Sequence, residues 1–263
     1  MLEEEVAVKV AIIAGGMGTR MQEETKTKPK ALVTLGGRPI MWHMMKYFGH
    51  YGLSDFVIAL GYKGDAIKDY FCQSSQSSEN IQPSGQSQGS DVFTADPAVW
   101  TTQMIDTGAD TQNGGRLRRL ADHLQDGTFF MTYCDSLMDA VPQNLIDFHK
   151  SHGRLATVIV VNPRSRFGFA ELEGDQVLRF SEKPLLTDRW ISTGYFILEP
   201  GIFDYIDGDD AEWSYDCLPR LASDGQLMAY RHKSFWRCMD TAKEREALEQ
   251  IWADTTPPWK VWE

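Results

Sequence analysis

Residues 8–20 read VKVAIIAGGMGTR, an apolar, β-branched run that opens directly into a glycine-rich segment. A run of this kind bounded by glycine predicts a buried strand followed by a turn. Glycines let the backbone approach a ligand closely and point N–H groups at it. Arg20 lies in the turn and Lys28 and Lys30 follow it, in a chain whose net charge is −11. The segment therefore predicts a phosphate-binding turn, of the kind that holds a nucleoside triphosphate.

Two common phosphate-binding motifs are excluded by the residues of this turn. A P-loop needs Gly-Lys-Ser/Thr five residues after its first glycine, and no such string follows Gly15. The dinucleotide fingerprint G-x-G-x-x-G would begin at Gly16 and Gly18, but Met21 holds the position of its third glycine. This argues against NAD or FAD. A bare Gly-Gly-x-Gly turn also fits a simple tight connection after a strand, so both interpretations stay open at this point.

The rest of the chain alternates between strand-like and helix-like patterns. Strands are predicted at residues 8–13, 56–60, 129–132, 156–161, 169–172 and 195–198, and helices at 40–49, 66–71, 115–123, 143–152 and 243–253. This alternation predicts an α/β fold, a Rossmann-like, mainly parallel mixed sheet covered by helices. A chain of 263 residues is expected to form one domain with, at most, a small lobe. Ligands bind at the carboxyl ends of the strands in such sheets, which is where the glycine turn lies.

Composition narrows the class of protein further. The net charge of −11 argues against binding to nucleic acid or to anionic membranes, and no apolar run long enough for a membrane span is present. A cytoplasmic location is expected. Four scattered cysteines make a zinc site or disulfide scaffold unexpected. Residues 72–104 form an insertion that is rich in Ser and Gln, and its first part, to about residue 89, is predicted to be a surface loop.

A longer set of motifs extends the interpretation of the turn. They are residues 14–21, 28–33, 37–40, 42–43, 61–64, 106–108, 114–117, 182–184, 239–241 and 258–263. Together they resemble the sugar-1-phosphate nucleotidylyltransferases, and within them the glucose-1-phosphate cytidylyltransferase branch, over nearly the whole chain. The resemblance implies one nucleotidylyltransferase domain over residues 1–263 with a small acceptor-binding lobe, and it implies a homo-oligomer. The implied reaction is Mg²⁺-dependent transfer of CMP from CTP to a sugar 1-phosphate, by default glucose 1-phosphate, with release of pyrophosphate.

In this reaction one phosphate oxygen attacks another phosphorus, so two anions must meet and their charge must be neutralised. The resemblance assigns catalysis to Arg20 and Lys30, and Mg²⁺ binding to Asp135 and Asp240. Asp135 follows an apolar run and so is expected at a strand's carboxyl end. Asp240 also follows an apolar run, but it precedes a predicted helix and could instead be that helix's N-cap. As a pair, the two carboxylates favour a metal site.

The resemblance also assigns binding residues for each substrate. The nucleotide is expected to contact Ala14, Gly15, Gly16, Gly18, Thr19, Arg20, Lys30, Thr107, Gly115 and Arg116. The acceptor is expected to contact Lys183, Ser192, Thr193, Gly194 and Asp216.

The chain departs from the family pattern on the acceptor side. Cys134 and Ser136 flank Asp135 where the family has glycines. Ser192-Thr193-Gly194 replaces the family's Asn-Gly-Gly segment, and Asp216 replaces a glutamate. A site built on hydrogen bonds discriminates strongly when a partner is lost or moved. The alternatives are therefore a cytidylyltransferase with a different phosphate acceptor, or a UTP- or dTTP-using enzyme on a sugar 1-phosphate.

Two other classes of protein fit less well. A glycosyltransferase would call for an Asp-x-Asp metal motif, which Asp135 and its neighbours do not supply. A silent regulatory subunit would be expected to lose Arg20, Lys30, Asp135 or Asp240, and all four are present.

Overall fold

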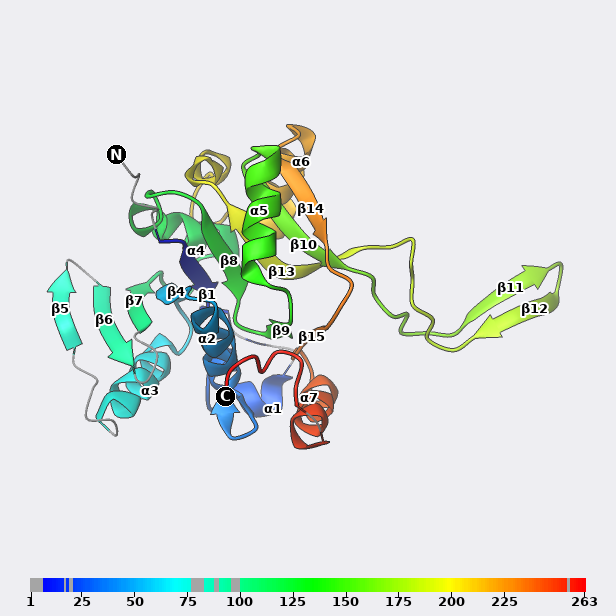
Figure 1. The fold of residues 1–263 in the computed structure, drawn as a ribbon, viewed down its shortest axis with the longest axis horizontal. Coiled ribbons are helices and arrows are strands. Elements are labelled where there is room, and N and C mark those ends of the chain that lie inside the picture. The colour runs from blue at the N-terminus through cyan, green and yellow to red at the C-terminus, as the bar shows by residue number, and fades with distance from the viewer. Residues whose placement is uncertain are drawn as a thin grey trace.

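The computed structural model of the protein describes residues 7–16, 18, 21–76, 83–87, 90–95, 100–254 and 256–263. These residues form a nine-stranded central sheet (Figure 1). In spatial order its strands are β14 Leu227–Arg231, β10 Ala156–Val161, β13 Ile191–Leu198, β8 Phe129–Tyr133, β1 Lys9–Ile13, β4 Asp55–Leu60, β7 Trp100–Asp106, β6 Ser90–Ala95 and β5 Pro83–Ser87. Strands β13 and β6 run opposite to the others. The predicted mainly parallel mixed sheet is confirmed.

Helices cover both faces of this sheet, because strand side chains alternate between two apolar cores. Along β1, Val10 and Ile12 face one core, whereas Ala11 and Ile13 face the other. The first core is covered by helices α2 Ile40–His50, α3 Gly64–Gln76, α5 Pro142–His152 and α7 Ala242–Asp254. The second is covered by α4 Asn113–Arg119 and α6 Leu218–Ser223. The strand after the glycine turn is thus buried on both sides, as its unbroken apolar sequence predicts.

Short elements connect these layers. They are α1 Gln22–Thr25, the strand pairs β2 Thr34–Leu35 with β3 Arg38–Pro39 and β9 Ser136–Met138 with β15 Trp236–Cys238, and the short helical turns Lys30–Leu32, Ala121–His123, Pro200–Tyr205 and Trp213–Cys217. No helix in the described part of the chain is long and apolar enough to cross a membrane.

Two predictions about the elements need correction. The strand predicted at residues 169–172 exists as β11 Phe169–Glu173, but it lies outside the central sheet and pairs only with β12 Gln176–Ser181. The two form an arm that projects far from the body (Figure 1). The Ser/Gln-rich stretch, predicted to be a loop, contains the end of α3 and strand β5, and β5 and β6 extend the edge of the sheet.

Candidate active site

The glycine turn leaves β1 at the carboxyl edge of the sheet and is fixed by backbone hydrogen bonds. The amide of Ala14 donates to Ala59 O at 3.0 Å, and Gly15 O accepts from the amide of Tyr62 at 3.1 Å. Gly18 has a φ of +63°, which favours glycine, and a Cβ atom on Gly16 would meet nothing within 4 Å. The turn is therefore anchored from behind while its backbone at Gly16 faces open space. Thr19 and Arg20, predicted to bind the triphosphate, lie outside the described residues.

Arg116 lies behind this turn and is 3% exposed. Its guanidinium donates to Thr107 Oγ1 at 2.8 Å, to Gly108 O at 2.6 Å and to Ala109 O at 3.0 Å. A Cβ atom on Gly15 would lie 2.4 Å from its Nη1 atom. Burial lowers the pKa of this arginine. In the structure Arg116 and Thr107 are both buried, and their hydrogen bonds hold the turn in place, while their contact with the nucleotide stays a prediction.

Gly115 has a packing role in the structure, and its predicted contact with the nucleotide stays a prediction. Its amide donates to Ala211 O at 3.2 Å, and a Cβ atom on it would lie 2.3 Å from Asp209 O. Only glycine lets α4 approach the 209–211 backbone this closely. The polar side chain of this helix that reaches the site is Asn113. We did not predict it, although its place at the start of α4 beside two glycines is a sequence signal.

Asp135 and Asp240 come together because β9 and β15 are antiparallel neighbours that pair Ser136 with Cys238. The amide of Met239 donates to Asp135 O at 2.8 Å. Between the two carboxylates lies Lys30, whose Nζ atom is 2.9 Å from Asp135 Oδ2 and also bonds Asp240 Oδ1. Burial lowers the pKa of Lys30, but the attraction of both aspartates outweighs it and raises the pKa above its ordinary value.

The alternative role of Asp240, as the cap of α7, is not what the structure shows. Thr241 Oγ1 accepts from the amide of Glu244 at 3.2 Å, and Glu244 Oε2 accepts from the amide of Asp240 at 2.9 Å. Thr241 is therefore the residue that caps α7, and Glu244, three residues later, holds the amide of the preceding residue. The carboxylate of Asp240 is directed to the site instead, where it meets Lys30.

These residues line a cleft of about 200 Å³. Its walls are Ile13, Gly16, Gly18, Lys30, Asn113, Tyr133, Cys134, Asp135 and Asp240. The cleft thus unites the glycine turn with both carboxylates and the lysine, as predicted from separate parts of the sequence. Paired carboxylates beside a phosphate-binding turn are a donor set that suits Mg²⁺, which prefers oxygen ligands and shares them with substrate phosphates. Burial raises the pKa of the neighbouring Cys134 thiol to about 12.

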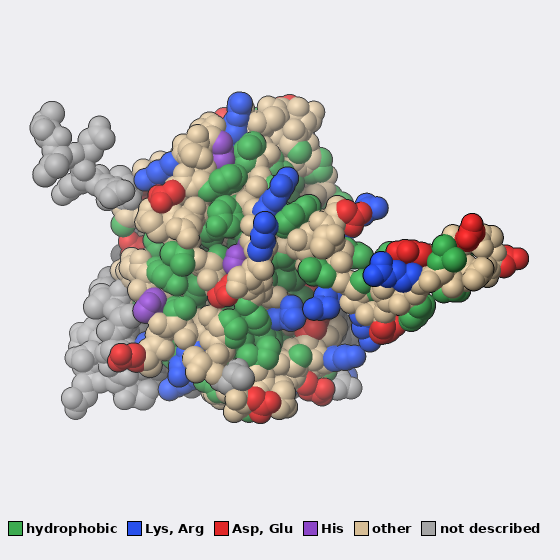
Figure 2. Space-filling view, turned by 45° about the vertical axis from the view of Figure 1, so that its right-hand side comes forward, with side chains coloured by type: hydrophobic (Ala, Val, Ile, Leu, Met, Phe, Trp, Pro, Cys, Tyr) green, Lys and Arg blue, Asp and Glu red, His purple; other side chains and the backbone are tan. Residues whose placement is uncertain are grey.

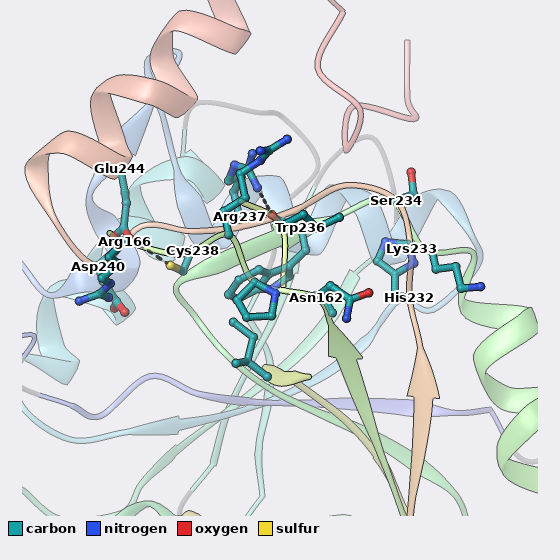
Figure 3. A pocket seen from close by; sticks show the side chains of 15 residues that line it. Asn162, Arg166, His232, Lys233, Ser234, Trp236, Arg237, Cys238, Asp240 and Glu244 are labelled. Atoms are coloured by element: carbon teal, nitrogen blue, oxygen red, sulfur yellow. Dashed lines mark hydrogen bonds between the residues drawn. The ribbon is translucent and has the colours of Figure 1, made fainter. Parts of the chain in front are cut away.

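A second pocket, of about 660 Å³, adjoins the cleft and shares Asp240 with it (Figure 3). Of the predicted acceptor residues, Thr193 lies behind its wall. Thr193 is buried, its Oγ1 donates to Ile159 O at 2.8 Å, and its carbonyl accepts from Trp236 Nε1 at 3.0 Å. Gly194 has a φ of +82° at an irregularity in β13. Thr193 thus supports the pocket wall through Trp236, Gly194 packs beside Tyr133 of the cleft, and Ser192 is exposed.

The two other predicted acceptor residues, Lys183 and Asp216, lie in different parts of the molecule. Lys183 is exposed at the base of the arm, next to Pro184, whose carbonyl accepts from the amide of Ser165. Asp216 lines another pocket, and its Oδ2 accepts from the amide of Glu212 at 2.7 Å. The structure therefore does not bring Asp216 to the cleft. From the same segment it is Ser214 that hydrogen-bonds Tyr133, a cleft residue.

Comparison with known proteins defines the class. Residues 9–256 match the family model described as nucleotidyl transferase. Among solved structures, HddC from Yersinia pseudotuberculosis has a TM-score of 0.68 at 19% identity, covering 93% of this chain and 99% of that one. That likeness shows the fold. The chain belongs to the nucleotidyl transferase family.

Two curated relatives match along their whole length. The glucose-1-phosphate cytidylyltransferase of Salmonella typhi is 40% identical over 257 residues, which cover 97% of this chain and 100% of the relative. A probable glucose-1-phosphate cytidylyltransferase of Bacillus subtilis is 38% identical over 256 residues, with the same coverage.

Proposed function

We propose that the protein transfers CMP from CTP to a sugar 1-phosphate, by default glucose 1-phosphate, and releases pyrophosphate. One observation carries this proposal: Lys30 lies between the carboxylates of Asp135 and Asp240 in a cleft floored by the glycine turn. The family membership supports the reaction type, and the names of the two full-length relatives support cytidine and glucose 1-phosphate.

The reaction makes one bond and breaks one. An oxygen of the acceptor phosphate attacks the α-phosphorus of CTP, and the bond from that phosphorus to the bridging oxygen breaks, so that pyrophosphate leaves with the electron pair. Because both reactants are anions, positioning and charge neutralisation are the main tasks. Asp135 and Asp240 would hold Mg²⁺, which when bound offsets phosphate charge. The backbone at Gly16 and Gly18 positions the triphosphate, and Lys30 carries positive charge to the place where the phosphates meet.

Lys30 is suited to this role because its charge is secured. Its raised pKa keeps the ammonium protonated throughout the neutral range, and its side chain is 11% exposed. Charges in a partly desolvated cleft act more strongly than in water. Asn113 adds an uncharged donor at the edge of the cleft.

The proposal is tested by incubating the protein with Mg²⁺, each of CTP, UTP and dTTP, and a panel of sugar 1-phosphates, with pyrophosphate as the readout. We expect release with CTP. Release only with UTP or dTTP would overturn the cytidylyl assignment, and no release with any pair would overturn the enzyme assignment. Release with CTP but not with glucose 1-phosphate would establish a different phosphate acceptor.

We also propose that the protein is a homo-oligomer joined through the arm of β11 and β12. The arm exposes large apolar side chains, among them Phe180 at 64%, Leu172 at 62% and Phe169 at 50%. Isolated two-stranded hairpins are marginally stable in water, so an apolar arm needs a covering surface. Light scattering should show an oligomer for the natural chain and smaller species for Phe180→Asp. A monomeric natural chain would contradict the proposal.

A further inference from the structure

The pocket beside the cleft is basic in a protein that is acidic. Overall the chain has 26 Lys and Arg against 37 Asp and Glu. The pocket reverses this balance, since four basic side chains line it together with two acidic ones. The basic ones are Arg164, Arg166, Lys233 and Arg237, and the acidic ones are Asp240 and Glu244. Figure 2 shows Lys and Arg side chains gathered where the arm leaves the body.

The two acidic residues are already engaged. Asp240 pairs with Lys30, and Glu244 accepts from the amide of Asp240 and from the hydroxyl of Thr241. By contrast, within the part of the chain that the structure describes, none of the four basic side chains forms an ion pair with a carboxylate. Cations that line one pocket without a carboxylate partner favour an anionic ligand, because each loses little on leaving water if an anion replaces its hydration.

The loop that carries Lys233 is rigidly held, as a binding wall needs to be. Asp139 accepts from the amide of Phe235 at 3.0 Å and from Ser234 Oγ at 2.6 Å, and its Oδ1 lies 2.9 Å from His232 Nε2. This network fixes the loop on both sides of Lys233. The lysine itself is exposed and makes none of these bonds.

The opposite wall, which carries Arg164, is held in the same way. Asn162 Nδ2 donates to Arg189 O at 2.6 Å and to Leu186 O at 3.2 Å, and Arg164 forms a backbone bridge with Leu185. The two segments leave the sheet side by side, because β10 and β14, from which they continue, are parallel neighbours whose carboxyl ends meet at one edge, and both segments line the pocket.

Among the described residues, the pocket and the cleft share one lining residue. Asp240 lines both the cleft and the pocket, and in Figure 3 it lies at the opposite end of the pocket from Lys233. Trp236 stands between these ends, with its indole fixed by the carbonyl of Thr193. An acceptor whose attacking phosphate lies at Asp240 would therefore extend along Trp236 toward Lys233.

We propose that the acceptor carries a second anionic group, a phosphate ester or a carboxylate, remote from the phosphate that attacks CTP, and that Arg164 and Lys233 bind it. This inference rests on the proposed nucleotidylyl transfer and names the class of its acceptor. The uncharged hydroxymethyl group of glucose 1-phosphate would leave the far end of the pocket without a counter-ion.

The test compares three acceptors with CTP and Mg²⁺: glucose 1-phosphate, glucose 1,6-bisphosphate and glucuronic acid 1-phosphate. The readout is kcat/KM from pyrophosphate release. Because a charge-assisted hydrogen bond is about twice as strong as a neutral one, we expect a gain of about tenfold or more for one of the two doubly anionic acceptors. Whichever gains more identifies the second group. Equal or lower kcat/KM for both, with glucose 1-phosphate turned over, would overturn the inference and leave the proposed function intact.

Variants test whether Arg164 and Lys233 bind the second anionic group. Arg164→Gln and Lys233→Gln should each reduce the ratio of kcat/KM between the favoured acceptor and glucose 1-phosphate by about tenfold, mainly through KM. Arg154→Gln, the same change at an exposed arginine outside the pocket, should leave the ratio unchanged. Thermal unfolding of each variant checks that the fold is retained. A ratio unaffected by Arg164→Gln and Lys233→Gln together would overturn the assignment of these residues.

Discussion

The assigned role of Arg116 leads to a prediction that separates support of the glycine turn from contact with the nucleotide. In Arg116→Met, the acceptors Thr107 Oγ1, Gly108 O and Ala109 O lose their donor. Leu60 O, which Arg116 also contacts, still accepts hydrogen bonds from the amide and the hydroxyl of Thr107. Three buried or half-buried acceptors at about 1 kcal/mol each give a loss of about 3 kcal/mol. For a chain of this size that corresponds to a fall in Tm of about 10 °C.

The assay is thermal unfolding together with steady-state kinetics in CTP. Because Arg116 acts from behind the turn, we expect the loss to appear mainly in stability, with KM for CTP raised by less than about tenfold. Arg118→Met is the matched control, since Arg118 lies on the same helix but is exposed, and substitutions there should change stability by about 0.5 kcal/mol at most. A variant of Arg116 with unchanged Tm and KM raised about a hundredfold would refute this reasoning and restore the nucleotide contact.

Three further changes have definite expected outcomes. Asp240→Asn should lower kcat by about a hundredfold or more and leave the fold intact, because it removes one of two carboxylates proposed to hold Mg²⁺; near-normal turnover would remove Asp240 from the metal site. Asp216→Ala should change KM for the acceptor less than about twofold. It should cost about 1 kcal/mol of stability, because the Asp216 carboxylate accepts a hydrogen bond from the amide of Glu212. A large rise in KM would show that Asp216 does contact the acceptor. Burial raises the pKa of Cys134 to about 12 and that of Cys217 to about 11, so both thiols are protonated at pH 8. They should therefore react slowly with a disulfide reagent until the chain is unfolded in urea. Mass spectrometry that found either thiol modified within seconds in the folded protein would contradict this.

The parts of the site that were predictable from sequence are those in which local order places the chemistry. Asp135 and the glycine turn each follow an apolar strand, and parallel strands bring such positions to one edge. Lys30 follows the turn closely enough to reach the same place. The pairing of Asp240 with Asp135 depended on the resemblance, because the two are joined by β9 and β15, strands too short to be recognised from their pattern.

The packing roles of Gly115 and Arg116 could not be predicted from the sequence, because they depend on partners far away in the chain. Gly115 is required by the backbone of Asp209, and Arg116 is buried by a turn about a hundred residues before it. A glycine that packs against backbone and a glycine that binds phosphate look alike in sequence. Likewise, the apolar run at residues 169–172 correctly predicts a strand. The pattern of apolar residues does not show which sheet the strand joins, and the structure places it on the arm.

The charge distribution connects the two halves of the site. With a net charge of −11, the protein repels anionic substrates at long range, but salt at physiological strength screens charges beyond about 8 Å. Capture must therefore depend on cations within the site itself. Lys30 supplies one, and it lies between the carboxylates of Asp135 and Asp240. In the proposed reaction, the basic side chains that line the adjoining pocket would supply further positive charge at the acceptor. The walls of that pocket come from segments nearly seventy residues apart, so the proposed choice of acceptor depends on how the chain folds and not on a local motif.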